Sequence, residues 1–245
     1  MTGELQGRVA LVTGAGQRVG RAIAVALGAR GMRVAVHHRA SADGARETVR
    51  QIEAAGGAGE TFAADLGEPG APERLVGEVA ARFGVLDALV NSAAVMERTP
   101  VGEVTVDAWD AMFALNLRAP FFAAQAAAGV MGARGGVIVN IADLAAFETW
   151  PAYVPHSITK AGVVQMTRAL ARALAPHVRV NAVAPGVVML PTGWDETSAE
   201  RLRRTTPLER LGTPDDVARA VVYLLEADFV TGETLLVDGG RHVRR

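Results

Sequence analysis

The stretch Thr13-Gly14-Ala15-Gly16-Gln17-Arg18-Val19-Gly20 decides the fold, because it joins a short apolar run, Val9 to Val12, to a helical segment that begins at Gly20. Glycines at a strand-to-helix turn let the backbone approach a pyrophosphate, and the amino end of the helix stabilises the negative charge. A tight turn with a purely structural role would use the same residues. The position of this stretch, at the first strand-to-helix junction of the chain, favours nucleotide binding.

Beyond this loop, short β-branched runs alternate with longer alanine-rich segments. Strands that are apolar on both faces are typical of a parallel sheet covered by helices. We therefore predict an α/β fold: a Rossmann-like, doubly wound, seven-stranded parallel sheet with helices on both faces. The predicted strands are Val9 to Val12, Val34 to Val36, Thr61 to Ala63, Ala88 to Val90, Val137 to Ile141, Val178 to Val183 and Leu235 to Val237, and the predicted helices are Gly20 to Ala29, Ser41 to Ala55, Pro72 to Phe83, Val106 to Met131, Tyr153 to Leu174 and Pro214 to Leu225.

The domain organisation follows from what interrupts this alternation. No linker-like, repetitive or low-complexity stretch divides the sequence, so we expect residues 1–245 to form a single domain. Residues 189–207 are the least regular part, and their proline, glycine and tryptophan content predicts a loop or a small lid.

Composition limits the function. The sequence has 25 Lys+Arg and 26 Asp+Glu, so its charge balance gives no indication of a nucleic-acid or anionic-membrane partner. It has no cysteine, which excludes a disulfide scaffold and a cysteine nucleophile, and the histidine spacing predicts no metal site. The longest apolar stretch, Ala119 to Met131, is shorter than the ~20 residues of a membrane span. The first residues lead directly into a strand and do not resemble a signal peptide, so we expect a cytoplasmic protein.

With these motifs in place, the chain resembles the short-chain dehydrogenase/reductase family over essentially its whole length. The resemblance implies a cofactor loop from Thr13 to Gly20, an adenine-contacting pair at Asp65-Leu66, and a nicotinamide-side turn at Pro185-Gly186. It also implies a catalytic Asn116 and a catalytic Lys160. Further matches are Asn91-Ser92-Ala93 after the fourth strand and Asp238-Gly239-Gly240 at the end of the last strand.

Two departures resemble one branch of the family, the pteridine reductases. Arg18 replaces a family glycine and, by this resemblance, meets the cofactor phosphates. The second strand ends in His38-Arg39-Ala40-Ser41, with no acidic residue to bind a ribose 2′-hydroxyl. Arg39 and Ser41 can meet a 2′-phosphate instead, so we predict NADP(H); as the alternative, Arg39 is a solvated loop residue and Ser41 only a helix cap. The cofactor-binding residues expected are Gly14, Gln17, Arg18, Val19, His38, Arg39, Ser41, Asp65, Leu66, Asn91, Ser92, Ala93, Lys160, Pro185, Gly186 and Val187.

The catalytic positions depart further. The family places a tyrosine four residues before its lysine and a serine thirteen residues before that tyrosine. In this sequence these positions hold His156 and Asp143. Asp at this position again resembles pteridine reductases, where it joins in substrate protonation. The candidate catalytic residues are therefore Asn116, Asp143, His156 and Lys160.

Three interpretations of the histidine stay open. His156 and Lys160 are four residues apart and share one face of the predicted helix. A lysine ammonium disfavours the imidazolium that could donate a proton, whereas an ionised Asp143 favours it. His156 is thus the working acid held protonated by Asp143, or Tyr153 replaces it from one turn earlier, or the site has lost the family's chemistry.

The substrate side gives fewer indications. Met96 stands where pteridine reductases place an aromatic for stacking. Phe147, Trp150, Met189 and Trp194 fall in segments that line the pocket in this family, and either packing or recognition explains them. We predict an NADP(H)-dependent reductase that acts on a carbonyl or C=N group of a small molecule and forms a homo-oligomer, a tetramer by family resemblance. The alternative is a non-catalytic NADP-binding or scaffolding protein.

Overall fold

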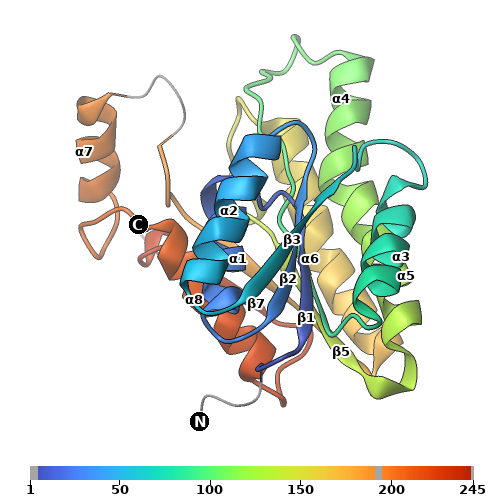
Figure 1. The fold of residues 1–245 in the computed structure, drawn as a ribbon. Coiled ribbons are helices and arrows are strands. Elements are labelled where there is room, and N and C mark those ends of the chain that lie inside the picture. Colours follow the sequence, from blue (N-terminus) through green and yellow to red (C-terminus); the bar gives the residue numbers. More distant parts are fainter. Residues whose placement is uncertain (1–4, 191–194, 244–245) are drawn as a thin grey trace.

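The computed structural model describes residues 5–190 and 195–243, which contain seven strands in one parallel sheet (Figure 1). The strand order is β3-β2-β1-β4-β5-β6-β7, and every neighbouring pair is parallel. The strands are β1 Val9–Val12, β2 Arg33–His38, β3 Ala58–Ala63, β4 Ala88–Asn91, β5 Gly136–Ile141, β6 Val178–Pro185 and β7 Thr234–Val237. The predicted fold class and all seven predicted strands are confirmed.

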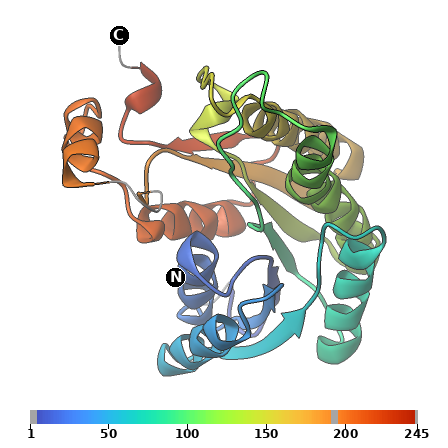
Figure 2. The same ribbon diagram turned by 90° about the horizontal axis from the view of Figure 1, so that it is seen from above.

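Helices cover both faces of this sheet, as predicted. Helices α1, α2 and α8 pack on one face and α3, α5 and α6 on the other, which is clearest along the sheet in Figure 2. The α-helices are α1 Arg18–Gly28, α2 Ala42–Ala54, α3 Ala71–Phe83, α4 Val106–Phe113, α5 Ala119–Met131, α6 Val154–Leu174, α7 Glu196–Arg204 and α8 Pro214–Glu226. No helix in the part of the chain that the structure describes is long and apolar enough to cross a membrane.

The sheet is not buried on both faces throughout. All residues of β1 and β4 are buried, as the prediction requires. None of the residues of β3 is, and the strand alternates between exposed and half-buried positions, with Glu60 paired to Arg82. The expectation of seven doubly buried strands is wrong for β3, because a strand at the sheet edge has a neighbour on one side only.

The predicted helix from Val106 to Met131 contains an irregular turn. Residues Ala114–Arg118 form a π-helical turn between α4 and α5. Such turns insert one extra residue into an α-helix and are frequent at functional sites. This turn carries Asn116, one of the expected catalytic residues.

Residues 189–207 were expected to be irregular, and this is wrong for part of the segment. Helix α7 lies within it and begins with Asp195, whose side chain accepts a hydrogen bond from the Ser198 amide. In both ribbon views α7 stands apart from the helices that cover the sheet (Figures 1 and 2). The segment also includes residues 191–194, which lie outside the described residues, as does the candidate pocket residue Trp194.

The strand order places the site. Connections from β1 run towards β2 and β3 on one side and, after β3, return to β4 on the other. In sheets of this kind, ligands bind beyond the carboxyl ends of the strands, where the winding direction changes. Here that point lies between β1 and β4, next to the glycine-rich loop that follows β1.

Candidate active site

The glycine-rich loop leaves β1 and lies against the chain that follows β4. The Thr13 hydroxyl accepts hydrogen bonds from the amides of Ser92 (2.9 Å) and Ala93 (3.0 Å). Gly14 has a φ of +66°, and a Cβ there would lie 2.8 Å from the Cα of Ala93. Only glycine therefore fits this position, which brings the loop and the β4 end together.

Arg18 is the second special position of the loop. Its φ is +52°, one of two positive values among non-glycine residues of the described chain. A side chain in this left-handed region costs about 1–2 kcal/mol. Arg18 thus keeps an unfavourable backbone conformation at the amino end of α1, the kind of position at which proteins bind anions.

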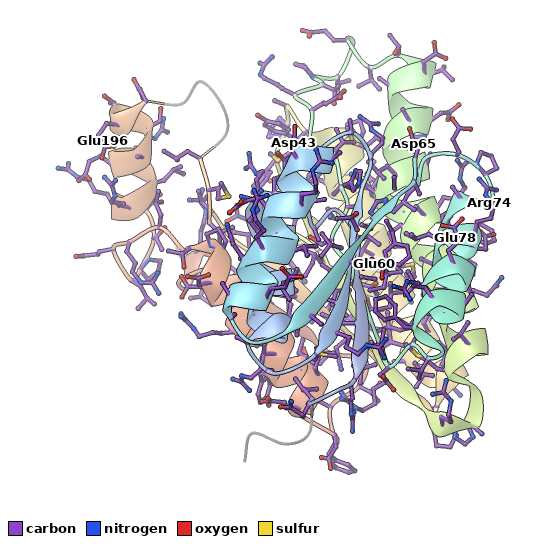
Figure 3. The ribbon with its side chains drawn as sticks, viewed as in Figure 1. Asp43, Glu60, Asp65, Arg74, Glu78 and Glu196 are labelled. Atoms are coloured by element: carbon purple, nitrogen blue, oxygen red, sulfur yellow. The ribbon has the colours of Figure 1, made fainter. Side chains whose placement is uncertain are left out.

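Arg39 and Ser41 follow β2, beside Asp65 at the end of β3. A guanidinium nitrogen of Arg39 lies 3.7 Å from a carboxylate oxygen of Asp65, and both side chains are largely exposed. Figure 3 shows Asp65 beyond the end of β3. Ser41 precedes α2, but its side chain makes no capping hydrogen bond, so the interpretation of Ser41 as only a side-chain cap finds no support.

The buried His37 connects three segments of this region. Its Nδ1 accepts a hydrogen bond from the Gly14 amide (3.0 Å), so Nε2 carries the proton and donates to the Ala64 carbonyl (3.0 Å). Burial is the main cause that lowers the pKa of His37 from 6.5 to about 4. The neutral ring thus joins the loop to the ends of β2 and β3.

Two expected cofactor residues turn their side chains away from the loop. Asn91 donates to Asn140 Oδ1 (2.9 Å) and to the Pro120 carbonyl (3.3 Å) inside the sheet. The Leu66 side chain is 4% exposed and belongs to the apolar core. Any contribution of Asn91 or Leu66 to binding therefore comes from the backbone.

Asn116 fixes the segment after β4. Its Oδ1 accepts from the Val95 amide (2.9 Å) and its Nδ2 donates to the Val95 carbonyl (2.8 Å). The same carbonyl lies 3.2 Å from His156 Nδ1. Since a carbonyl only accepts, His156 Nδ1 is protonated, and Val95 links the π-helical turn to α6.

Asp143, His156 and Lys160 converge beyond the end of β5. Asp143 caps the short 3₁₀ turn Leu144–Ala146, accepting a hydrogen bond from the Ala145 amide (2.8 Å). Its second carboxylate oxygen lies 3.7 Å from His156 Nε2. The Asp143 side chain is 24% exposed and that of His156 only 3%, so the carboxylate faces outward and the imidazole lies behind it.

Lys160 lies one helical turn after His156. Its ammonium donates a hydrogen bond to the Ile141 carbonyl (2.9 Å) at the end of β5. Burial is the larger influence and lowers the pKa of Lys160, while the negative charge of Asp143 raises it. The three side chains therefore form one electrostatically connected group.

The remaining expected positions lie along the same edge. Pro185 ends β6, and the Gly186 amide bonds the Val237 carbonyl of β7 (3.0 Å). A Cβ on Gly186 would lie 2.8 Å from the Asp238 side chain. Val187 receives a backbone hydrogen bond from Gly212 (3.0 Å), which holds the start of the 189–207 segment.

Of the candidate pocket residues, Met96, Phe147 and Met189 are exposed, at 43%, 45% and 38%. Core packing therefore does not explain them. Tyr153 packs its ring edge-on against Trp150, with centroids 6.2 Å apart. In the described chain, Tyr153 therefore packs against Trp150 beside the start of α6, and no contact joins it to the Asp143–His156 pair.

Sequence reasoning missed the side chains that support the loop from outside: His37, Arg21 and Thr48. These residues belong to no recognised motif. Threonine and arginine on helices are usually solvated, so the residue types gave no indication of a structural role. The sequence did contain one signal of a buried polar network in this region. Asn91 and Asn140 stand opposite each other at the ends of adjacent apolar strands. Buried polar residues in apolar strands need partners.

These residues fit NADP(H). The loop leads into the amino end of α1, where backbone amides can bind a pyrophosphate, and Arg18 is the first residue of that helix. Arg39 and Ser41 supply a cation and a hydroxyl for a 2′-phosphate. His38 Nδ1 is buried and has no hydrogen-bond partner among the described residues, so this nitrogen is able to bond a polar atom of a ligand.

The comparisons with known proteins agree with this geometry. Residues 14–242 match a family model described as "Enoyl-(Acyl carrier protein) reductase". The chain is 39% identical to L-xylulose reductase of Bos taurus, covering 96% of this chain and 97% of that protein. It is 36% identical to a putative ketoacyl reductase of the granaticin polyketide synthase of Streptomyces violaceoruber, covering 96% of each.

Solved structures give the same result. A putative short-chain alcohol dehydrogenase from Sinorhizobium meliloti superposes with a TM-score of 0.93 at 36% identity, covering 98% of each chain. The angucycline C-6 ketoreductase LanV with bound NADP superposes with a TM-score of 0.91 at 35% identity, again covering 98% of each chain.

Proposed function

The chain belongs to the short-chain dehydrogenase/reductase family, and we propose that it is an NADP(H)-dependent reductase of a small-molecule carbonyl or C=N group, with Asp143, His156 and Lys160 at its active site. Its cofactor is NADP(H). When bound, the cofactor supplies or takes up the hydride. The residues of the chain bind the cofactor, orient the substrate and handle the proton.

One observation carries the proposal. Asp143, His156, Lys160 and Asn116 come from three separate elements, yet contacts through Val95 and Ile141 join them beyond the ends of β4 and β5. This is the edge at which the glycine-rich loop lies against Ala93. Titratable groups gathered beside a cofactor loop are the expected arrangement of a hydride-transfer site.

The hydrogen bond to Val95 defines which atom of His156 handles the proton. Nδ1 donates to the carbonyl, so Nε2 has a lone pair in the neutral ring and a proton only in the imidazolium. Asp143 stabilises that imidazolium from 3.7 Å. Because Asp143 is the more exposed partner, we propose that a substrate meets the carboxylate and that the proton passes between Nε2 and the substrate beside it.

Lys160 has two roles in this proposal. Its ammonium, held by Ile141, orients the nicotinamide ribose, as the family resemblance implies. It also counterbalances the negative charge of Asp143, which raises the pKa of Lys160 against the larger lowering effect of burial. Asn116 fixes Val95 and thereby the orientation of the imidazole.

A pteridine reductase-like specificity is the finer part of the proposal. Arg18 and Asp143 support it, since both match that branch. The exposed Met96, Phe147 and Met189 offer an apolar surface for a flat ring, although Met96 replaces the branch's stacking aromatic. A C=N group suits a site in which a carboxylate faces the substrate, because nitrogen carries a proton more readily than a ketone oxygen does.

A second function is a non-catalytic NADP-binding protein. The observation that favours it is that His156 Nε2 is buried without a hydrogen-bond partner among the described residues. At 3.7 Å from Asp143 it is too far for a hydrogen bond. A proton-donating atom enclosed in this way would reach a substrate only after the site rearranges.

The test is NADPH oxidation with a panel of dihydropterins, quinones, ketones and cyclic imines, alongside calorimetric titration of NADPH. We expect turnover with at least one class, abolished in Lys160→Ala. Tight NADPH binding with no turnover on any class would favour the non-catalytic function. Undiminished turnover of Lys160→Ala would show that the active site is misassigned.

We also propose that residues 1–245 act as one domain, that the 189–207 segment with α7 covers the substrate, and that the protein is a cytoplasmic homotetramer. Exposed apolar side chains on neighbouring helices support oligomerisation: Val106 of α4, Phe121 of α5 and Ile158 of α6 are 74%, 38% and 44% exposed. Light scattering after size exclusion measures the number of subunits, and a monomer would contradict the tetramer.

A further inference from the structure

Arg21 and Thr48, which belong to none of the recognised motifs, clamp the glycine-rich loop to the first turn of α2. We propose that they are positioning residues that hold the pyrophosphate loop and the 2′-phosphate segment at a fixed separation, and that they thereby set the discrimination between NADPH and NADH. We refer to Arg21 and Thr48 as the clasp. The inference rests on the proposed use of Arg39 and Ser41 for the 2′-phosphate.

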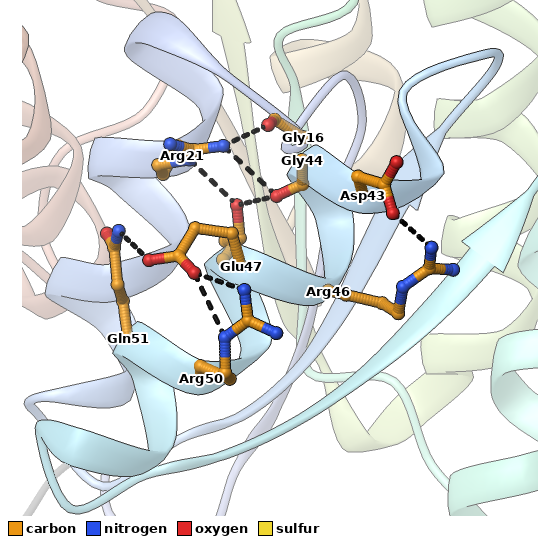
Figure 4. Close-up of polar contacts among 9 residues, drawn as sticks. Gly16, Arg21, Asp43, Gly44, Arg46, Glu47, Arg50 and Gln51 are labelled. Carbon is orange, nitrogen blue, oxygen red and sulfur yellow. Dashed lines mark hydrogen bonds and ion pairs between the residues drawn. The ribbon is translucent and has the colours of Figure 1, made fainter.

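Arg21 is the larger half of the clasp (Figure 4). From α1, one terminal nitrogen donates to the Gly16 carbonyl of the loop (2.7 Å) and to the Gly44 carbonyl of α2 (3.1 Å). Its Nε donates to the Thr48 hydroxyl (3.1 Å). A single guanidinium thus joins α1, the loop and α2.

Thr48 completes the connection from inside. The residue is fully buried, and its hydroxyl lies 2.9 Å from the Ala15 carbonyl and 3.0 Å from the Gly44 carbonyl. The hydroxyl accepts from Arg21 and has one proton to donate to either carbonyl. In a buried network of this kind, removal of one member leaves the others unsatisfied.

The two segments are in direct contact at this point. A Cβ on Gly16 would lie 3.2 Å from the Ser41 carbonyl oxygen. A Cβ on Gly44 would collide with both the Ser41 hydroxyl and the Gly16 carbonyl oxygen. Ser41, one of the proposed 2′-phosphate residues, therefore has its place fixed by the same contacts that hold the loop.

Other charged residues of α2 do not make such a connection. Arg46 pairs with Asp43 and Arg50 with Glu47, within the same helix and largely exposed (Figure 4). Exposed pairs of this kind contribute little. Arg50→Met is therefore a matched control for Arg21→Met.

The consequence for binding follows from preorganisation. NADPH engages both sites at once, so its affinity depends on their separation being fixed, in the way that a bivalent ligand depends on its linker. NADH uses the loop without the 2′-phosphate segment, and adenosine 2′-monophosphate uses that segment without the pyrophosphate. Loosening the clasp should therefore weaken NADPH more than either of these ligands.

The experiment measures dissociation constants by calorimetry for NADPH, NADH and adenosine 2′-monophosphate, with no turnover required. We expect Arg21→Met and Thr48→Val to weaken NADPH roughly tenfold, and the other two ligands by less than about threefold. Thr48→Ser, which keeps the hydroxyl, and Arg50→Met should bind all three as the unchanged protein does. In an Arg21→Met background, Arg39→Ala should cost less NADPH affinity than it does alone.

Equal weakening of NADPH and NADH in both variants would overturn the inference, because it would indicate general damage to the loop. Unchanged NADPH binding would overturn it as well. If circular dichroism shows that Arg21→Met does not fold, the binding data for Thr48→Val alone test the inference. Thr48→Ser then serves as the rescue variant. If the unchanged protein does not prefer NADPH over NADH, the 2′-phosphate assignment itself is wrong, an outcome distinct from failure of the clasp.

Discussion

The cofactor end and the proposed catalytic end of this protein share one edge of one sheet, but they are held in different ways. The glycine-rich loop is fixed by side chains from three directions, with His37 on the Gly14 amide, Thr48 on Ala15 and Arg21 on Gly16. At the other end, the His156 side chain makes one hydrogen bond within the described chain, to Val95, and faces Asp143 across 3.7 Å.

The two ends therefore differ in which residues can be replaced by others. Phosphate binding depends on backbone geometry, so glycines and their supports have few alternatives. Proton handling depends on side-chain chemistry, and in the proposed mechanism an imidazole and a carboxylate take the place of a hydroxyl.

The largest effect should come from His156→Ala. We expect turnover to fall by about 10²–10⁴-fold, the usual contribution of a general acid, with NADPH affinity unchanged. The measurement is a pH–rate profile and an NADPH titration on the same preparations.

The exposed His177 supplies the control, since His177→Ala should leave rate and affinity unaltered. His156→Tyr should restore turnover at neutral pH if the pocket accepts the longer ring. A fully active His156→Ala with a flat profile would remove the imidazole from the mechanism and return attention to Tyr153.

The second effect concerns the cofactor end and pH. The pKa of His37 is lowered from 6.5 to about 4 mainly by burial, so the unfolded chain binds this proton first as pH falls. The free energy of unfolding should therefore decrease between pH 6.5 and 4, by at most roughly 3 kcal/mol at 1.36 kcal/mol per unit. Urea titrations across this window measure it.

His37→Gln is the comparison, because an amide can still accept from Gly14 and donate to Ala64 but does not titrate. Its stability should vary less over the same window. Asp216, whose pKa is lowered to about 2 chiefly by its hydrogen bond to Arg210, loses its stabilising contribution only at lower pH. An identical pH dependence in both proteins would contradict the assignment to His37.

Arg39→Ala should have the third effect. Loss of a charge-assisted hydrogen bond should weaken NADPH by about 1.5–3 kcal/mol and leave NADH nearly unchanged. Calorimetry with the two cofactors measures it. Arg46→Ala, which removes another exposed arginine nearby, is the control. Equal losses for NADPH and NADH would rule out the 2′-phosphate contact.

The smallest effect should come from Arg18→Gly. With φ at +52°, glycine relieves the strain at this position, so we expect stability to rise by up to about 1 kcal/mol. NADPH affinity should fall, because a cation beside the phosphates is lost. Thermal unfolding and titration measure the two effects. A variant that gains stability and keeps full affinity would show that the arginine has no role in binding.

The sequence alone predicted most of the fold, because apolar strands and amphipathic helices follow local periodicity. Two predictions failed where local pattern is insufficient. The exposure of β3 depends on strand order, and α7 is a short, mostly charged helix with only Ala199 and Leu202 as apolar residues.

The candidate site was predicted as a set of positions but not as an arrangement. Spacing relative to Lys160 located Asp143 and His156, and the structure places them 3.7 Å apart. The sequence spacing could not reveal the role of Val95. This residue has no polar side chain, but its backbone carbonyl fixes the tautomer of the imidazole. Nor could the spacing reveal the clasp, whose acceptors are backbone carbonyls that any sequence would supply.

The π-helical turn at Ala114–Arg118 has a consequence for insertions and deletions. Each residue of an α-helix advances the chain by about 100° around its axis, so removing one residue here would straighten the helix and turn Asn116 away from Val95. A one-residue deletion should thus damage the site more than most point substitutions do. Sequence alignments that place a gap between 114 and 118 would misidentify the asparagine.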